Sequence, residues 1–167
     1  MINIEIDRLT NSIVNAISGD VFDTEVLPIT AKDLKTITKA KGWKFDWKKQ
    51  AKEGNIYKLV IAGNPNIIQG LVCFNDNSDH IYLSLIENAP FNFGAKKLYL
   101  GVAGNLFAYS CKVSFEQGYE GFVAFHAKTE LIEHYTTMLG AKRMGNSLLM
   151  FIETKAAMNL VKKYFKP

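Results

Sequence analysis

The chain has 167 residues, of which 48% are hydrophobic and 22% charged, and its net charge at pH 7 is +4. These values suit one soluble folded domain with a sizeable core. No apolar run reaches the roughly 18 residues that a membrane-spanning helix needs, and the first residues lack the cationic and apolar regions of a signal peptide. We therefore expect a cytoplasmic protein without a membrane partner.

The first 28 residues carry the weakest pattern in the sequence. Isoleucine alternates with polar residues over Asn3–Asp7, as in a short strand. A turn signal at residues 18–20 favours a hairpin between Ser12–Ile17 and Val21–Ile29, and a short helix over Thr10–Ile17 is nearly as well supported.

A helix is predicted next, over Ala31–Lys41. Thr30 is a good N-cap with Asp33 three residues later, and Gly42 is a good C-terminal residue for ending the helix.

An aromatic cluster, Trp43, Phe45 and Trp47, then stands among lysines. Interleaved aromatic and basic residues can stack nucleic-acid bases. There is only one such cluster, however, and no RNA-binding motif accompanies it. We therefore favour a core anchor that joins a helix to a sheet, with lysine stems lying over it.

The remainder of the chain indicates a mixed α/β fold. Three consecutive strands with short turns, Ile56–Ala62, Ile67–Phe74 and His80–Ile86, predict an antiparallel meander. A helix at Val102–Gln117 then forms a crossover long enough for parallel pairing with a strand at Gly121–Phe125. Leu148–Ile152 is the expected last core strand, and Thr154 the expected cap of a C-terminal helix.

Two cysteines, Cys73 and Cys111, lie far apart in sequence within apolar patterns. Because there is no metal-ligand spacing, we expect reduced core thiols and no metal site. The mild positive charge permits an anionic ligand or RNA without requiring either.

Small residues are concentrated where the long helix begins, at Gly101, Ala103 and Gly104. They leave the unpaired N–H groups of the first helical turn open to close approach, which suits a phosphate or pyrophosphate. The alternative is a tight turn before a buried helix.

The order of strand, glycine loop, long helix, strand and then a helix with Tyr135 ahead of Leu139-Gly140-Ala141 resembles the GNAT N-acetyltransferase superfamily. The resemblance covers roughly Ile56–Phe151. It implies one GNAT-like domain over residues 1–167, with N-terminal elements in 1–50, a core over about 56–151 and a C-terminal helix at 154–165. Its mixed sheet would combine the meander with a β-α-β-α-β unit, flanked by helices.

The resemblance also implies acetyl-CoA as cosubstrate. In this family two neighbouring strands splay apart, free backbone groups of one pair with the pantetheine arm, and the glycine loop holds the pyrophosphate. The strand corresponds to Tyr82–Glu87, and its exit resembles the Glu-x-Ala-Pro-x-Asn of some members. The implied cofactor-binding residues are Leu85, Ile86, Gly101, Val102, Ala103, Gly104 and Asn105, and the implied substrate-binding residues are Phe91 and Asn92.

Acetyl transfer needs a base near the amine and an acid near the sulfur. The resemblance implies Tyr135 as the acid, and Glu87 is the best candidate for the base. The alternatives are a packing tyrosine and a surface glutamate. The family pattern differs at two positions: Tyr135 lies five rather than four residues before Gly140, and Leu98 replaces a usual Gln or Arg.

The expected function is transfer of an acyl group from acetyl-CoA to a primary amine. The acceptor is a small amine, a protein N-terminus or lysine, or an aminoacyl-tRNA, and a homodimer is left open. One alternative is a GNAT-fold binding or regulatory module without catalysis. Another is a nucleic-acid-binding protein that uses residues 43–52.

Overall fold

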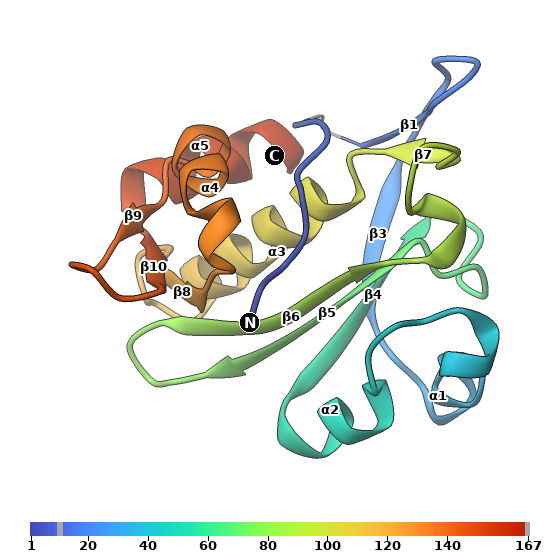
Figure 1. Ribbon diagram of the computed structural model, residues 1–167, viewed down its shortest axis with the longest axis horizontal. Helices are drawn as coiled ribbons and strands as arrows, with labels where there is room; N and C mark the ends of the chain where they lie inside the picture. Colours follow the sequence, from blue (N-terminus) through green and yellow to red (C-terminus); the bar gives the residue numbers. More distant parts are fainter. Residues whose placement is uncertain (10–11, 166–167) are drawn as a thin grey trace.

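The computed structural model describes residues 1–9 and 12–165 and is built around a twisted seven-stranded sheet (Figure 1). The strand order is β3-β4-β5-β6-β8-β10-β9. These strands are β3 (Thr24–Pro28), β4 (Asn55–Ile61), β5 (Gly70–Asp76), β6 (Ile81–Asn88), β8 (Val123–His126), β9 (Lys142–Arg143) and β10 (Leu149–Ile152). A three-stranded sheet of order β2-β1-β7 is formed by β1 (Ile13–Asn15), β2 (Val21–Phe22) and β7 (Tyr99–Leu100).

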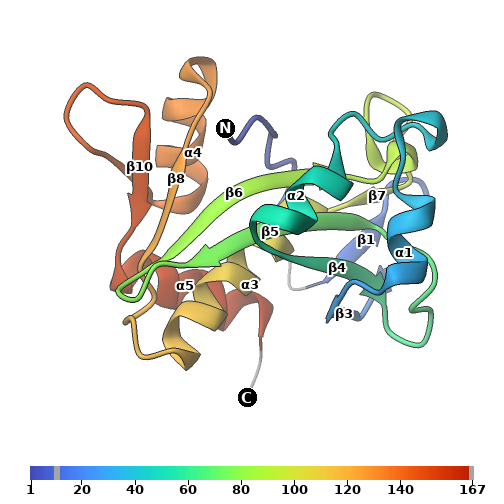
Figure 2. The same cartoon turned by 90° about the horizontal axis from the view of Figure 1, so that it is seen from below.

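Helices cover both faces of the main sheet. The α-helices are α1 (Ala31–Thr36), α2 (Trp47–Glu53), α3 (Val102–Glu116), α4 (Ile132–Leu139) and α5 (Thr154–Tyr164). Short 3-10 turns are η1 (Lys39–Lys41), η2 (Pro90–Asn92) and η3 (Thr129–Leu131). Helices α3 and α5 lie on one face and α1 and α2 on the other (Figure 2). No helix in residues 1–9 and 12–165 is both long and apolar enough to cross a membrane.

The pairing of the strands confirms the predicted mixed sheet. Strands β3 to β6 form an antiparallel meander, β6 and β8 are parallel, and β8, β10 and β9 are antiparallel. The parallel pair is made through α3, as the length of this crossover predicts.

The meander separates two hydrophobic cores because its side chains alternate between the faces. On β5, Val72 and Phe74 belong to the larger core beneath α3, whereas Leu71 and Cys73 belong to the smaller core beneath α1 and α2. This alternation fails once in β6. The register with β5 shifts there, so that Ser84 has no opposite residue. Such a bulge bends a strand and increases its twist.

The smaller core confirms the aromatic cluster as an anchor. The exposed fraction of Trp43 is 7% and that of Trp47 is 1%, and both pack with Ile37 of the α1 region and with Leu71 and Cys73 of the sheet. A base-stacking surface formed by these two indoles is therefore excluded.

Several predictions near the chain's beginning need correction. The hairpin is confirmed only between β1 and β2, because Thr24–Pro28, part of the predicted second arm, pairs with β4 instead. The helical alternative over Thr10–Ile17 is wrong for residues 13–15; residues 10 and 11 lie outside the described part. The strand over Asn3–Asp7 is also wrong. These residues join no sheet ladder, and only the neighbouring Ile2 makes an isolated bridge, to Ala127.

The predicted helix over 31–41 is divided, and the cap of the last helix is shifted. The capping box of Thr30 and Asp33 forms as expected, but α1 ends at Thr36, because Thr38 then caps the separate turn η1. Gly42 ends that turn. The N-cap of α5 is Glu153 rather than Thr154.

Candidate functional site

The predicted pyrophosphate loop lies where β7 leads into α3. Gly101 precedes the helix with a φ of 94°, a left-handed conformation that glycine adopts without strain. Its N–H donates to Asp7 Oδ1 at 3.0 Å, and Lys97 Nζ lies 2.9 Å from Asp7 Oδ2. A carboxylate is therefore held at the positive end of α3, between a backbone donor and an ammonium group.

The first turn of α3 is tightly packed against the same part of the chain. Val102 and Ala103 are each only 1% exposed. A Cβ added to Gly104 would collide with the Tyr164 hydroxyl and lie 3.1 Å from the carbonyl oxygen of Arg8. The small residues of this turn thus permit close approach, and what approaches here is residues 7 and 8 together with the Tyr164 hydroxyl.

Asn105, which the sequence predicts to bind the cofactor, makes hydrogen bonds within the chain. Its Nδ2 donates to the carbonyl oxygens of Gly101, at 2.8 Å, and Ser12, at 3.2 Å. It therefore ties the helix start to β1.

Strands β6 and β8 separate soon after they pair. They are in register only at Ile81 with Val123 and at Tyr82 with Ala124, just before the bulge at Ser84 (Figure 2). We call the space beyond this point the β6–β8 cleft. It contains residues 2–8, which we call the cleft segment, and a cavity of about 640 Å³.

The cleft segment is bound mainly through its backbone. Ile2 N–H donates to the carbonyl of His126 at 2.6 Å, and the Ile2 carbonyl accepts from Lys128 N–H at 2.9 Å. Ile6 N–H donates to His134 Nε2 at 2.8 Å, so this nitrogen acts as an acceptor. The side chains of Ile2 and Ile6 are buried in the larger core.

Tyr135 is both a core residue and a contact of the cleft segment. Its ring is fully buried and lies 5.7 Å from that of Phe107 and 5.4 Å from that of Phe125, centroid to centroid. Its hydroxyl donates to the Ile4 carbonyl at 2.5 Å and accepts from the Ile4 N–H at 3.0 Å. Burial raises the pKa of Tyr135 to about 12, so the phenol is protonated at neutral pH.

Glu87 is buried rather than at the surface, so the surface alternative is wrong. Its Oε2 accepts from Lys44 N–H at 2.7 Å, and its Oε1 accepts from Trp47 Nε1 at 2.7 Å and from Phe45 N–H at 3.4 Å. The carboxylate thereby fixes the segment before α2 to the end of β6, and it also lines the cavity.

The two predicted substrate-binding residues differ in their surroundings. Asn92 is fully buried; its Nδ2 donates to Gln69, and its Oδ1 accepts from Tyr99 N–H at 3.0 Å. It lines the cavity but mainly shapes the loop before α3. Phe91 is partly exposed and does not line this cavity.

The two predicted cofactor-binding residues of β6 belong to different hydrophobic cores. Because of the bulge, Leu85 belongs to the smaller core, whereas Ile86 belongs to the larger core and lines the cavity.

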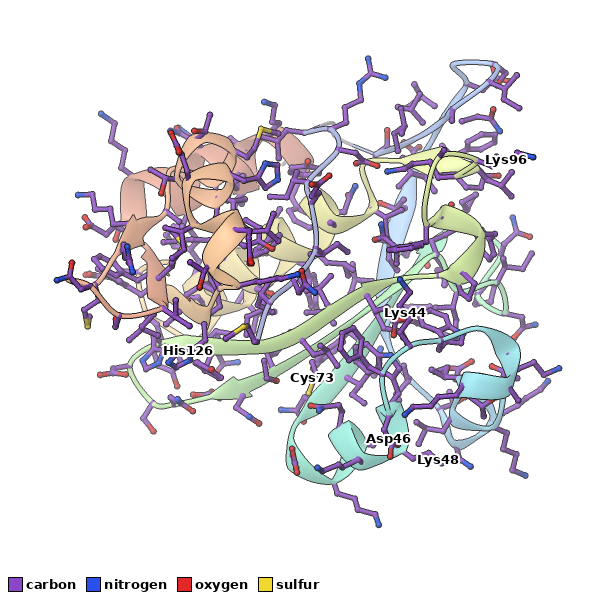
Figure 3. All side chains as sticks on the ribbon, viewed as in Figure 1. Lys44, Asp46, Lys48, Cys73, Lys96 and His126 are labelled. Atoms are coloured by element: carbon purple, nitrogen blue, oxygen red, sulfur yellow. The ribbon has the colours of Figure 1, made fainter. Side chains whose placement is uncertain are left out.

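The cavity lies between the cleft segment, the end of β6 and the segment before α2. Its charged lining residues are Glu5, Lys44, Glu87, Lys97, Lys128 and Glu130. Lys44, labelled beside the far end of β6 in Figure 3, places its ammonium 3.3 Å from the centre of the Phe93 ring. Asn88 Oδ1 is buried at the cavity wall and has no hydrogen-bond partner within the described residues.

The glycine loop and Tyr135 are thus brought together through the cleft segment, and Glu87 faces the same cavity as Ile4. The sequence reading missed Asp7, His134 and the segment itself. The alternation of isoleucine in residues 2–6 was the available signal, but it resembles any half-buried strand. Among residues 1–9 and 12–165, no three His, Cys, Asp or Glu side chains are grouped to hold a metal ion.

No family model matches this sequence, and no curated protein matches it either. Solved structures do match. A chimera of spermidine N-acetyltransferase SpeG from Vibrio cholerae with hSSAT is 17% identical, with a TM-score of 0.57 over 81% of this chain and 98% of that one. An acetyltransferase of the GNAT family from Staphylococcus aureus Mu50 is 11% identical, with a TM-score of 0.50 over 78% and 99%.

The AtaT protein matches in two complexes. With acetyl-methionyl-tRNAfMet it is 15% identical, with a TM-score of 0.55 over 83% of this chain and 99% of that one. As AtaTR bound with acetyl-CoA it is 15% identical, with a TM-score of 0.51 over 83% and 98%. At such low sequence identity the similarity to these structures shows the fold alone, and it confirms the predicted architecture.

Proposed function

Because the chain has the GNAT fold, we propose that it is an acyl-CoA-dependent N-acyltransferase with acetyl-CoA as donor and a primary amine as acceptor. The observation that carries the proposal is the divergence of β6 from β8 beside a glycine-started helix, with the Tyr135 hydroxyl directed into the cleft. The complex of AtaTR with acetyl-CoA and the name of SpeG support the donor and the reaction class.

The residues of the cleft fit such a donor, because the groups that the cleft segment presents to them resemble groups of acetyl-CoA. Asp7 presents an anion to Gly101 N–H and to Lys97, as a pyrophosphate would. The peptide groups of Ile4 and Ile6 meet the side chains of helix α4 as an amide-bearing arm would. The Gly101–Gly104 backbone and Lys97 would hold the pyrophosphate, with the β6 backbone at Leu85 and Ile86 beside the arm and Asn105 keeping the loop in place.

Acetyl-CoA, when bound, supplies a thioester carbonyl and a thiol leaving group. Glu87 uses three of the roughly four acceptor positions of a carboxylate, which leaves one for the proton that an amine in the cavity must lose. Tyr135 holds its proton at neutral pH and is the group that gives it to the departing sulfur. A carbon–nitrogen bond replaces the carbon–sulfur bond, and one proton is taken and one given.

The acceptor belongs to one of three classes: a small amine, a protein N-terminus or lysine, or an aminoacyl-tRNA. SpeG is named for the first class, and the AtaT complex with acetyl-methionyl-tRNAfMet represents the third. Phe91 and Asn92 lie in the turn η2 after β6, and Asn92 lines the cavity. We propose that both residues act on acceptor choice.

A second candidate is a GNAT-fold binding module without catalysis. It is favoured by one observation: the cleft segment already satisfies Gly101 N–H and the Tyr135 hydroxyl.

Thiol release from acetyl-CoA, measured with a panel from the three acceptor classes, separates the candidates. The protein's own thiols add little background to this assay, because Cys73 and Cys111 are buried and burial raises the pKa of both. We expect turnover with at least one class and a fall of about 10²-fold or more in Tyr135→Phe. Binding of acetyl-CoA without turnover by any acceptor would favour the module.

A further inference from the structure

We infer that residues 2–8 are an intramolecular ligand of the cosubstrate cleft, so that the cleft segment and acyl-CoA exclude one another. The inference rests on the proposed function, because it takes the β6–β8 cleft to be the acyl-CoA site. It adds a regulatory step, in which the segment must leave before the donor binds.

The backbone of the segment makes hydrogen bonds to the end of β8 and to side chains of helix α4. Ile2 pairs with the end of β8, Ile4 exchanges two hydrogen bonds with the Tyr135 hydroxyl, and Ile6 donates to His134. These are contacts of main-chain amides with groups that face the cleft. In Figure 1 the segment begins beside β6 and runs away from it, across α3 toward the loop between β7 and α3, and Figure 2 places the beginning of the chain near β6 and α4.

The end of the segment closes the glycine loop. Asp7 takes the Gly101 N–H and pairs with Lys97, while the carbonyl oxygen of Arg8 lies 3.1 Å from the position that a Cβ on Gly104 would take. An anionic ligand at this helix start therefore needs the same donors and the same space as Asp7 and Arg8.

The segment is held firmly but not by the sheet. Ile2 and Ile6 are 0% and 3% exposed, yet residues 3–9 join no ladder. A segment held by side chains and a few backbone bonds opens locally more readily than a paired strand. The apparent Kd for acyl-CoA is then the intrinsic Kd divided by the fraction of molecules in which the segment is undocked.

The test combines acetyl-CoA titration with hydrogen exchange of the peptide over residues 1–9. The variants are Asp7→Asn, which removes one charge from the pair with Lys97, and Ile6→Asp, which places a charge in the core and should release the segment. Asp20→Asn is the matched control, because Asp20 is an exposed acid in the β1–β2 turn. Circular dichroism confirms that each variant remains folded.

If the inference is right, saturating acetyl-CoA raises the exchange rates of the Ile2, Ile4 and Ile6 amides by about tenfold or more. Asp7→Asn binds acetyl-CoA about two- to fivefold more tightly than the wild type, the range expected for one partly exposed charge at a helix start. Asp20→Asn binds like the wild type. If Ile6→Asp is the one variant that binds acetyl-CoA, and its residues 1–9 exchange freely, the inference is also supported. The segment is then docked in nearly all wild-type molecules.

Two results would overturn it, and they are distinguishable. If acetyl-CoA binds while the three amides stay protected, the segment and donor coexist, and only the inference fails. If Ile6→Asp exchanges freely over residues 1–9 and still binds no acetyl-CoA, the proposed donor site fails as well.

Discussion

Replacing Tyr135 with Phe tests the contact between the cleft segment and α4. The hydroxyl accepts from the Ile4 N–H at 3.0 Å and donates to the Ile4 carbonyl at 2.5 Å, and its ring is fully buried. Phe preserves the ring contacts with Phe107 and Phe125 and removes both hydrogen bonds. Leaving a buried polar group without its partner costs about 1–3 kcal/mol.

Because the cavity beside Ile4 admits water to part of this site, we expect the free energy of unfolding to fall by about 2 kcal/mol. For a chain of this size that lowers the melting temperature by about 4–8 °C. Urea unfolding and a thermal scan measure the two values, and hydrogen exchange at Ile4 should become faster in the variant.

Tyr109→Phe is the matched control. Tyr109 is a half-buried tyrosine beside the rings of Tyr57 and Phe74, and its hydroxyl makes no hydrogen bond within the described residues. It should lose little stability. If Tyr135→Phe is no less stable than Tyr109→Phe and its Ile4 amide stays protected, the hydroxyl does not hold the segment and the reasoning is refuted.

Four further outcomes are expected. Trp43→Ala should lower the free energy of unfolding by about 3–5 kcal/mol in urea, without changing affinity for single-stranded RNA; a stable variant with weakened RNA binding would contradict this. Burial raises the pKa of Tyr135 to about 12 from about 10 in the unfolded chain, so its stabilising contribution is lost between about pH 10 and 12, and the stability–pH slope there should be shallower in Tyr135→Phe. Burial opposes ionisation of Asp33, but Lys58 and Thr30 outweigh it and hold the pKa below its usual value, so stability should fall as the pH drops below about 4. Lys58→Met should lower the free energy of unfolding by about 3 kcal/mol at pH 7 and remove most of that acid dependence. Urea unfolding of both proteins at a series of pH values measures the two effects.

Local patterns in the sequence predicted much of the fold. The capping box of Thr30 with Asp33 depends on neighbours in the chain and is present as predicted, and α3 begins at the predicted residue, Val102. The strands of the meander follow from alternation and turn residues, which are also local. Their ends differ by a few residues because turns tighten or extend under tertiary packing.

The contents of the cleft could not be predicted in this way. Alternating isoleucines show that one side of residues 2–6 is buried, but not whether the partner is a sheet edge or a gap between strands. Glu87 is tied to Trp47 across 40 residues, and Tyr135 to Ile4 across 131. Contacts of that separation leave no periodic trace. The bulge at Ser84, which opens the cleft, is likewise visible only in the register of β6 with β5.

The same separation of 131 residues sets an order of events during synthesis. Residues 2–8 leave the ribosome long before β8 and α4, which supply their hydrogen-bond partners. Until those elements emerge, the isoleucines of the segment have no site in which to bury. Contacts so distant in the chain form late and slowly. Docking of the segment therefore waits for α4, whereas the meander of β3 to β6 lies wholly before α4 in the chain and can form first.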